Sequence, residues 1–375
     1  MKKIGIFTHP LISNYGGILQ NFALQKVLES RGYDVITINR FQKLSMFRVL
    51  LSRVKQSLLK HHTNRIFSAK EKSVLTVNSQ AFVKNNIKKV DFINPTDKDL
   101  LTYVNNHNIN TLIVGSDQVW RPGYVSNIYH EFFSFLPNES NVKRVSYAAS
   151  FGTDKCEYTE EQLARCSKLL SQFDAVSVRE KSGIELCSNY LKRDDAQVVL
   201  DPTLLLEKED YLAVVKNQLV EKKGVYTYVL DSSAEKNKII DTVCSQLNLE
   251  KFSNQPKFSE IGGKGKSSNL KDYAFPPIGD WIEGFYRSSF VVTDSFHGTV
   301  FAIIFNKPFI AIANVERGKA RFESLLKLFG LENRLVSTIN EISTDLISEE
   351  IDFEAVNSKR EALKKISIDF LINNI

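Results

Sequence analysis

Residues 289–299 read Ser289-Phe290-Val291-Val292-Thr293-Asp294-Ser295-Phe296-His297-Gly298-Thr299, and an apolar run to Ile312 follows them. Phe290 to Val292 are aromatic or β-branched, which predicts a strand that is covered on both faces. A helix then begins near His297, so a carboxylate, a hydroxyl and an imidazole follow the carboxyl end of the strand. Ligands of open α/β sheets bind at this end, and the first N–H groups of a helix favour anions. The stretch therefore predicts an α/β fold with an anion site.

The rest of the chain alternates apolar segments with helical patterns, which indicates βα units and parallel sheets. We predict a first helix over Ile18–Ser30 and a last one over Glu354–Ile375. The predicted strands are Ile4–Thr8, Asp34–Ile38, Thr111–Val114, Val145–Ala148, Ala175–Val178, Val198–Leu200 and Val225–Leu230, with a second α/β set running on to Ile310. Because 375 residues exceed one small core, we expect two Rossmann-like domains, 1–205 and 206–375. Whether the last helix docks back on the first domain stays open.

The composition is that of an ordinary globular protein, with 43% hydrophobic and 25% charged residues. The net charge of +6 is modest, and it suits anionic ligands or an anionic membrane surface about as well as nucleic acid. We expect no nucleic-acid partner. The four cysteines are widely spaced, so we expect free thiols and no metal site. Met1 to Phe7 lacks the apolar core of a signal peptide, and no apolar stretch is long enough to span a bilayer. We expect a cytoplasmic protein.

One segment, residues 43–72, departs from the βα pattern. It contains eight Lys or Arg residues and one acid, Glu71, and seven apolar residues recur in it at helical spacing. A basic amphipathic helix of this kind can lie on an anionic membrane surface, here the inner face of the membrane. The alternative is a helix that packs by its apolar face and leaves its lysines in solvent.

Three further motifs follow predicted strands. Asn14-Tyr15-Gly16-Gly17 opens the first helix, where adjacent glycines let backbone N–H groups approach a ligand or simply make a packing turn. Gly115-Ser116-Asp117-Gln118-Val119-Trp120-Arg121 offers polar groups and Trp120, whose ring suits either a sugar or the core. Ser177-Val178-Arg179-Glu180 places a guanidinium where it can bind an anion or pair with Glu180.

Together these motifs resemble the polysaccharide pyruvyl transferase family. The matching residues, in chain order over roughly residues 3–330, are Asn14 to Gly17 with Gln20, Ala23 and Leu24, then Val114 to Trp120, Ser177 to Glu180, Asp201-Pro202-Thr203, and Thr293 to Gly298 with Ala302 and Pro308. The resemblance implies a glycosyltransferase-B-like (GT-B-like) fold with its active site in the interdomain cleft. It also implies transfer of pyruvate from phosphoenolpyruvate to a sugar of a capsule or exopolysaccharide precursor, as a cyclic ketal and with no further cofactor.

The resemblance assigns roles to residues as well. Arg179 and His297 would contact the donor, with His297 as acid, base or phosphate ligand and Asp294 as its orienting group or as a base. The first domain would hold the acceptor, a nucleotide- or lipid-linked sugar, and the second the donor. The residues expected to bind substrates are Asn14, Tyr15, Gly16, Gly17, Gly115, Ser116, Asp117, Gln118, Trp120, Arg121, Ser295, Phe296, Gly298 and Thr299.

Ser295 departs from the family pattern, because many members carry an arginine two residues before the histidine. Either the donor differs, or the missing charge comes from one of five cations: Arg121, Arg287, Arg317, Lys319 and Arg321. The alternative functions are a glycosyltransferase of the same fold that uses a nucleotide sugar, and a sugar-binding relative without catalysis. The sequence leaves open which sugar is modified and how many subunits assemble, a homo-oligomer included.

Overall fold

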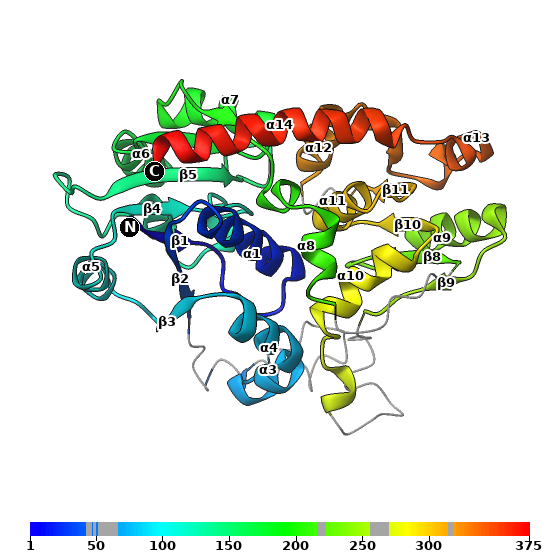
Figure 1. Ribbon diagram of the computed structural model, residues 1–375, viewed down its shortest axis with the longest axis horizontal. Coiled ribbons are helices and arrows are strands. Elements are labelled where there is room, and N and C mark those ends of the chain that lie inside the picture. Colours follow the sequence, from blue (N-terminus) through cyan, green and yellow to red (C-terminus); the bar gives the residue numbers. More distant parts are fainter. Residues whose placement is uncertain (43–46, 48–49, 52–66, 216–222, 256–269, 314–317) are drawn as a thin grey trace.

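The computed structural model describes residues 1–42, 47, 50–51, 67–215, 223–255, 270–313 and 318–375. In these residues two parallel β-sheets lie side by side, each flanked by helices (Figure 1). The central strands are buried along their whole length, as in Thr111–Val114 and Phe290–Thr293. Burial on both faces is the reason that their sequences are continuous apolar runs. The predicted fold of two parallel α/β domains is confirmed.

The first sheet has seven strands in the described part of the chain, in the order β3-β2-β1-β4-β5-β6-β7. Every neighbouring pair is parallel. The strands are β1 Lys3–Phe7, β2 Asp34–Phe41, β3 Lys89–Ile93, β4 Thr111–Val114, β5 Lys143–Ala149, β6 Ala175–Val178 and β7 Gln197–Val198. The helices around them are α1 Tyr15–Glu29, α3 Ala69–Leu75, α4 Val77–Asn86, α5 Asp97–Asn106, η1 Pro122–Tyr124, η2 Ile128–Phe132, α6 Glu160–Leu170, α7 Lys181–Leu191, η3 Pro202–Leu205 and α8 Lys208–Leu212.

The second sheet has the order β12-β11-β10-β8-β9, again with parallel pairs. Its strands are β8 Val225–Tyr228, β9 Lys251–Phe252, β10 Phe290–Thr293, β11 Phe309–Ile312 and β12 Leu335–Val336. The helices of this part are α9 Ala234–Leu247, η5 Leu270–Tyr273, α10 Ile278–Arg287, α11 Phe296–Ile304, α12 Ala320–Phe329, η6 Glu332–Arg334, η7 Ile339–Glu341, α13 Thr344–Ser348 and α14 Phe353–Asn374.

A continuous apolar core joins the two sheets. One hydrophobic cluster contains residues of α1, η3 and α8 together with residues of α10, α11 and α14. Across it, the rings of Tyr15 from α1 and Trp281 from α10 lie 5.8 Å apart between centroids. Polar contacts add to it, because Tyr15 Oη donates a hydrogen bond to Pro276 O at 2.6 Å. A large apolar interface of this kind holds two domains in one fixed arrangement.

Helix α14 crosses from the second domain to the first. Figure 1 shows it running from α13 over the sheet interface to the side of β5 and α6. Leu200 N donates a hydrogen bond to Ser367 Oγ at 2.9 Å, and Lys2 Nζ donates one to Ile375 O at 3.0 Å. The last helix therefore links both domains and docks on the first.

Strand β3 and the basic segment 43–72 stand apart from the predicted elements. Strand β3 was not predicted, because it is an edge strand whose residues are half-buried or exposed and so lacks an apolar run. The predicted basic amphipathic helix lies mostly outside the described residues. Of its apolar residues, the structure describes Phe47, Leu50 and Leu51, which are exposed.

Candidate functional site

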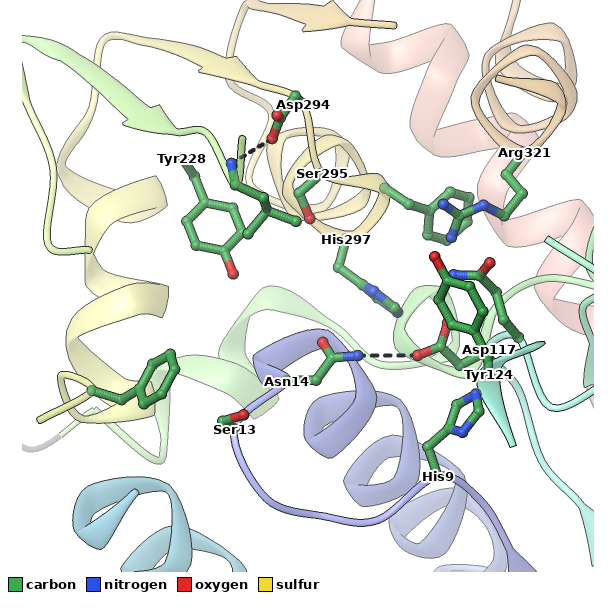
Figure 2. Close-up of a pocket in the computed structure, with 14 residues that line it drawn as sticks. His9, Ser13, Asn14, Asp117, Tyr124, Tyr228, Asp294, Ser295, His297 and Arg321 are labelled. Atoms are coloured by element: carbon green, nitrogen blue, oxygen red, sulfur yellow. Dashed lines mark hydrogen bonds between the residues drawn. The ribbon is translucent and has the colours of Figure 1, made fainter. Parts of the chain in front are cut away.

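Each sheet has a point where its strand order reverses, between β1 and β4 in the first sheet and between β8 and β10 in the second. The connections leave such neighbouring strands toward opposite faces, so a crevice opens at their carboxyl ends. The two crevices join in one cleft of about 470 Å³ (Figure 2). It is lined by His9, Ser13, Asn14, Asp117, Gln118, Tyr124, Tyr228, Leu230, Phe275, Asp294, Ser295, Phe296, His297 and Arg321.

The turn between β10 and α11 directs His297 into this cleft. Thr293 Oγ1 donates a hydrogen bond to Tyr228 O at 2.6 Å and accepts one from Ser295 N at 3.1 Å. Ser295 is the N-cap of α11, and its Oγ accepts a hydrogen bond from Gly298 N at 3.3 Å. A Cβ at Gly298 would lie only 2.2 Å from Thr293 Oγ1, so the turn requires glycine there.

His297 belongs to the second domain but packs against the first. Its side chain is nearly buried, and its Nε2 lies 3.6 Å from Asp201 Oδ2. The opposite edge of the ring faces α1, because a Cβ at Gly16 would lie 2.0 Å from His297 Nδ1. Gly16 thus makes room for the imidazole, and any side chain there would displace the ring. The predicted role of Gly16 in substrate binding becomes a role in placing His297.

Asp201 is the buried carboxylate that faces His297. Its Oδ2 accepts hydrogen bonds from Ser116 Oγ at 2.8 Å and from Arg179 Nη1 at 3.0 Å. Its Oδ1 accepts from the backbone N and the Oγ1 of Thr203 at 3.0 and 2.6 Å. Burial by itself would raise the pKa of Asp201, but His297, Arg179 and these hydrogen bonds outweigh burial and hold the pKa well below its usual range. Asp201 is therefore a permanent anion beside the histidine.

Arg179, predicted to contact the donor, does not line the cleft. Its side chain is only 2% exposed and lies 3.0 Å from Asp201 and 3.7 Å from both Asp117 and Glu180. The guanidinium also lies over the ring of Phe296, 4.2 Å from its centroid. Burial opposes the charge, but the three carboxylates raise the pKa of Arg179 above its ordinary value. The structure therefore corrects the prediction: Arg179 holds the carboxylates in place from behind the cleft wall.

Asp117 is a carboxylate of the cleft wall itself. Its φ of 77° lies in the left-handed region, which costs a non-glycine residue energy and is often found at functional sites. Asn14 Nδ2 donates a hydrogen bond to Asp117 Oδ2 at 3.1 Å, so the loop after β4 is tied to the start of α1. Burial would raise the pKa of Asp117, but Arg179, His9 and His297 lower it to about 2.

This pKa gives a test of the charge network. Asp117→Asn is expected to lower the free energy of unfolding by about 2 kcal/mol near pH 7, because the variant loses the attraction to the surrounding cations. Asn keeps the shape and tolerates the left-handed backbone. The stability that Asp117 contributes is complete above its unfolded pKa of 3.8 and is lost as pH falls toward 2. Urea unfolding should therefore show a difference that narrows below about pH 4, and a difference independent of pH would contradict the assignment.

The prediction that Trp120 stacks on a sugar is wrong. Its side chain is fully buried, and its ring stacks on Phe132 with centroids 5.1 Å apart and planes 7° from parallel. Its neighbour Arg121 also lies outside the cleft lining and pairs with Glu157 at 2.9 Å. Both residues follow β4, but the chain directs Trp120 into the hydrophobic core and Arg121 toward the surface. Of this motif, only Asp117 and Gln118 line the cleft.

Asp294 does not orient His297 as predicted. Its Oδ1 accepts a hydrogen bond from Leu230 N at 2.6 Å, and its Oδ2 accepts from Asp231 N at 3.2 Å and Lys236 Nζ at 2.6 Å. The carboxylate therefore fixes the loop after β8. The place beside the imidazole that the sequence analysis gave to Asp294 is taken by Asp201, which comes from the first domain.

The remaining predicted residues divide into two groups. Asn14, Ser295 and Phe296 line the cleft, as do Asp117, Gln118, Asp294 and His297, which are described above. The others bond or pack within the protein: Tyr15 (Oη to Pro276 O, 2.6 Å), Gly17 (N to Asn14 Oδ1, 3.1 Å), Ser116 (Oγ to Asp201), Thr299 (Oγ1 to Ser295 O, 3.2 Å), Gly298 against Thr293, and Gly115 against Leu24 and Ile6.

Six lining residues were missed. His9 and Ser13 follow β1, and Tyr228 and Leu230 stand at the end of β8, so the strand-end rule applied to every strand would have found these four. The other two had no such signal, because Tyr124 ends the short helix η1 and Phe275 lies between η5 and α10, away from any strand end.

The five candidate cations lie in different surroundings. Arg287 pairs with Glu283 at 2.9 Å, and Lys319 pairs with Glu323 at 3.0 Å. Arg121 is held by Glu157, and Arg317 lies outside the described residues. Arg321 is the one of the four described candidates that lines the cleft. It is nearly buried, and its guanidinium lies 5.8 Å from the centroid of the Phe296 ring.

The described ranges contain neither a metal-binding cluster nor a helix that could cross a membrane. No cluster of three or more His, Cys, Asp or Glu side chains there is arranged to hold a metal ion. No helix in those ranges combines the length and apolarity that crossing a membrane requires.

Comparisons with known proteins support the same fold and add a family. A family model described as polysaccharide pyruvyl transferase matches residues 14–316. No curated protein matches the chain. Among solved structures, the S. aureus MnaA–UDP complex is 13% identical with a TM-score of 0.53, covering 100% of this chain and 98% of that one.

Two further structures have TM-scores of 0.50. A putative UDP-N-acetylglucosamine 2-epimerase from Listeria monocytogenes is 11% identical, covering 100% of this chain and 92% of that one. A structure titled as the glycotransferase of kitacinnamycin is 12% identical, covering 100% and 99%. At such identities the likeness concerns the fold alone, and it agrees with the GT-B-like arrangement.

Proposed function

Since the chain belongs to the polysaccharide pyruvyl transferase family, we propose that it transfers pyruvate from phosphoenolpyruvate to a sugar of a cell-surface polysaccharide precursor and forms a cyclic ketal. The acceptor in this proposal is a nucleotide- or lipid-linked sugar, and the reaction takes place in the cytoplasm. Phosphoenolpyruvate is a co-substrate, and the proposal includes no further cofactor.

The observation that carries the proposal is the meeting of His297 and Arg321 in one cleft, with Asp201 behind the histidine. Phosphoenolpyruvate has a carboxylate and a phosphate, and a guanidinium binds either group through paired hydrogen bonds. Burial and the neighbouring Arg179 lower the pKa of Arg321 to about 10, which still leaves it charged at neutral pH. The first turn of α11 lies at the same end of the cleft and favours anions.

The proposed reaction needs a proton at the methylene carbon of the donor and the loss of a proton from each of two sugar hydroxyls. A proton added to the methylene carbon of phosphoenolpyruvate turns it into a methyl group and leaves a positive centre at the neighbouring carbon. One sugar hydroxyl bonds to that centre and gives up its proton. Phosphate then leaves with the electron pair of its C–O bond, and a second hydroxyl closes the ketal. We assign the first proton to His297, because general acids of this type are held by an adjacent carboxylate.

The direct test is to incubate the protein with phosphoenolpyruvate and a panel of UDP-glucose, UDP-galactose and UDP-N-acetylglucosamine, with lipid-diphosphate sugars as further acceptors. Phosphate release that depends on the acceptor, together with a mass gain of pyruvate minus water on the sugar, is the expected result. Release of UDP from a UDP-sugar without phosphoenolpyruvate would favour the glycosyltransferase alternative. Binding of the sugars without any turnover would favour the non-catalytic alternative.

Arg321→Gln is expected to raise the KM for phosphoenolpyruvate by about 10–100-fold, since a hydrogen bond to a charged group contributes about 1.5–3 kcal/mol. The matched control is Lys319→Gln, because Lys319 lies just before the same helix, is 45% exposed and pairs with Glu323. The control should keep its KM. Steady-state phosphate release at varied phosphoenolpyruvate concentration measures the KM of both variants. Equal KM values for wild type and Arg321→Gln would show that Arg321 does not bind the donor.

A further inference from the structure

His9 is a titratable side chain of the cleft to which no role has yet been given. It follows β1, lines the cleft from the first domain, and lies before the residues 14–316 that the family model matches. Its Nε2 is buried, and no described residue forms a hydrogen bond with it. A buried polar atom without a partner is costly, and it calls for an explanation such as a ligand or a catalytic role.

His9 and His297 come from different domains and approach the same carboxylate. Figure 2 shows Asp117 between the two imidazoles, with His297 entering from α11 and His9 from the loop after β1. The electrostatic attraction of both histidines to Asp117 is part of what lowers its pKa. The cleft therefore holds two imidazoles on opposite walls, each near a buried carboxylate: Asp201 for His297 and Asp117 for His9.

We propose that His9 is the second catalytic residue, the base that takes the proton from the attacking sugar hydroxyl. The inference rests on the proposed function and completes its proton transfers. The domains support these separate roles, because Arg321 and the first turn of α11, the proposed contacts of the donor anion, both belong to the second domain. The acceptor then enters from the first-domain wall, where His9 stands. An imidazole next to a carboxylate can hold a proton that it has removed.

The two imidazoles of His297 and His9 account for every proton transfer of the proposed reaction. Protonated His297 gives its proton to the methylene carbon and becomes neutral. His9 takes the proton of the first hydroxyl as its oxygen bonds to the positive carbon. Phosphate leaves with the electron pair of the C–O bond and receives the proton from His9, while neutral His297 takes the proton of the second hydroxyl. Both residues return to their starting states, and the products are the ketal and hydrogen phosphate.

The test compares His9→Gln with wild type at varied phosphoenolpyruvate, varied acceptor and varied pH, using the acceptor that the panel above identifies. The expected result is a kcat lower by about 10²–10⁴-fold, with the KM for phosphoenolpyruvate within about threefold of wild type. The pH dependence of kcat should lose one of its two limbs. The other titratable or charged groups that line the cleft are Asp117, Tyr124, Tyr228, Asp294, His297 and Arg321, and the variant leaves all of them in place.

A second variant separates proton transfer from structure. His9→Ala should lose activity in the same way and regain part of it when imidazole is added, because His9 is only partly buried and its removal leaves a space that opens into the cleft. A role in packing alone would not respond to imidazole. The control is His107→Gln, an exposed histidine after α5 whose ring stacks on Tyr103 and which is not among the residues that line the cleft, so it should keep full activity.

The outcomes separate the two proposals. If wild type releases no phosphate from phosphoenolpyruvate with any acceptor, the proposed function fails and the role of His9 fails with it. If wild type is active and His9→Gln keeps its kcat and both limbs of the pH profile, only the role of His9 is overturned. A loss of activity that imidazole does not restore in His9→Ala, in a folded variant, also overturns it.

Discussion

A His297→Gln variant is expected to lose about 10²–10⁴-fold in kcat, the range by which a well-placed general acid or base accelerates a reaction. Gln fills a similar volume and can still form hydrogen bonds, but it cannot carry a proton between carbon and oxygen. The free energy of unfolding should change little compared with kcat, because the Nε2 of His297 lies 3.6 Å from Asp201, beyond hydrogen-bond distance. Acceptor-dependent phosphate release gives kcat, and urea unfolding gives the stability.

Gly16→Ala is the companion variant. Its new methyl group would meet His297 Nδ1 at 2.0 Å, so the ring must move although the histidine itself is unchanged. We expect kcat to fall in Gly16→Ala as well, because displacing a catalytic group by about 1 Å can cost 100-fold. Wild-type activity in both variants would contradict the assignment of His297, and lost activity in His297→Gln alone would mean that the ring adapts to the methyl group.

Asp201→Ala is expected to lower the free energy of unfolding by about 3–5 kcal/mol, since it removes one partner of a buried ion pair. The guanidinium of Arg179, only 2% exposed, would keep the two carboxylates at 3.7 Å and lose the one at 3.0 Å. The hydroxyls of Ser116 and Thr203 would lose their acceptor at the same time. The variant should also be inactive, because the carboxylate facing His297 is gone.

The matched control is Asp241→Ala. Asp241 pairs with Lys251 at 2.6 Å, but both side chains are more than half exposed, so water screens the pair. Its removal should cost less than about 1 kcal/mol. Urea unfolding of both variants near pH 7 measures the contrast. A loss below about 1 kcal/mol in Asp201→Ala would show that the buried cluster contributes no more than a surface pair.

Sequence patterns predicted helices and strands most reliably where the pattern lies within one run of consecutive residues. The strand, turn and helix from Phe290 to Ile304 were predicted because an apolar run, a short polar turn and a second apolar run follow one another without a gap. The same local logic gave β4, β6 and α14 to within a residue or two. It missed β3, whose edge position leaves it no continuous apolar run.

Side chains at strand ends were harder to assign, because their surroundings come from distant parts of the chain. Arg179, Trp120 and Asp117 all follow strands of the first sheet and all are buried, yet only Asp117 lines the cleft. What covers Arg179 is Phe296 from the second domain, which no local pattern could show. The partner of His297 was sought in the neighbouring Asp294 and is found in Asp201, in the other domain.

The sequence by itself determined the element types, the parallel α/β class, the family and the presence of His297 at a strand end, because hydrophobic periodicity and capping act over a few residues. Only the tertiary structure decided which groups face the cleft. It brought Asp201 and Gly16 to His297, selected Arg321 among the candidate cations and placed His9 on the opposite wall. The reason is physical: the charge and proton chemistry of a buried group depend on neighbours within a few ångströms, and in this cleft those neighbours come from two domains.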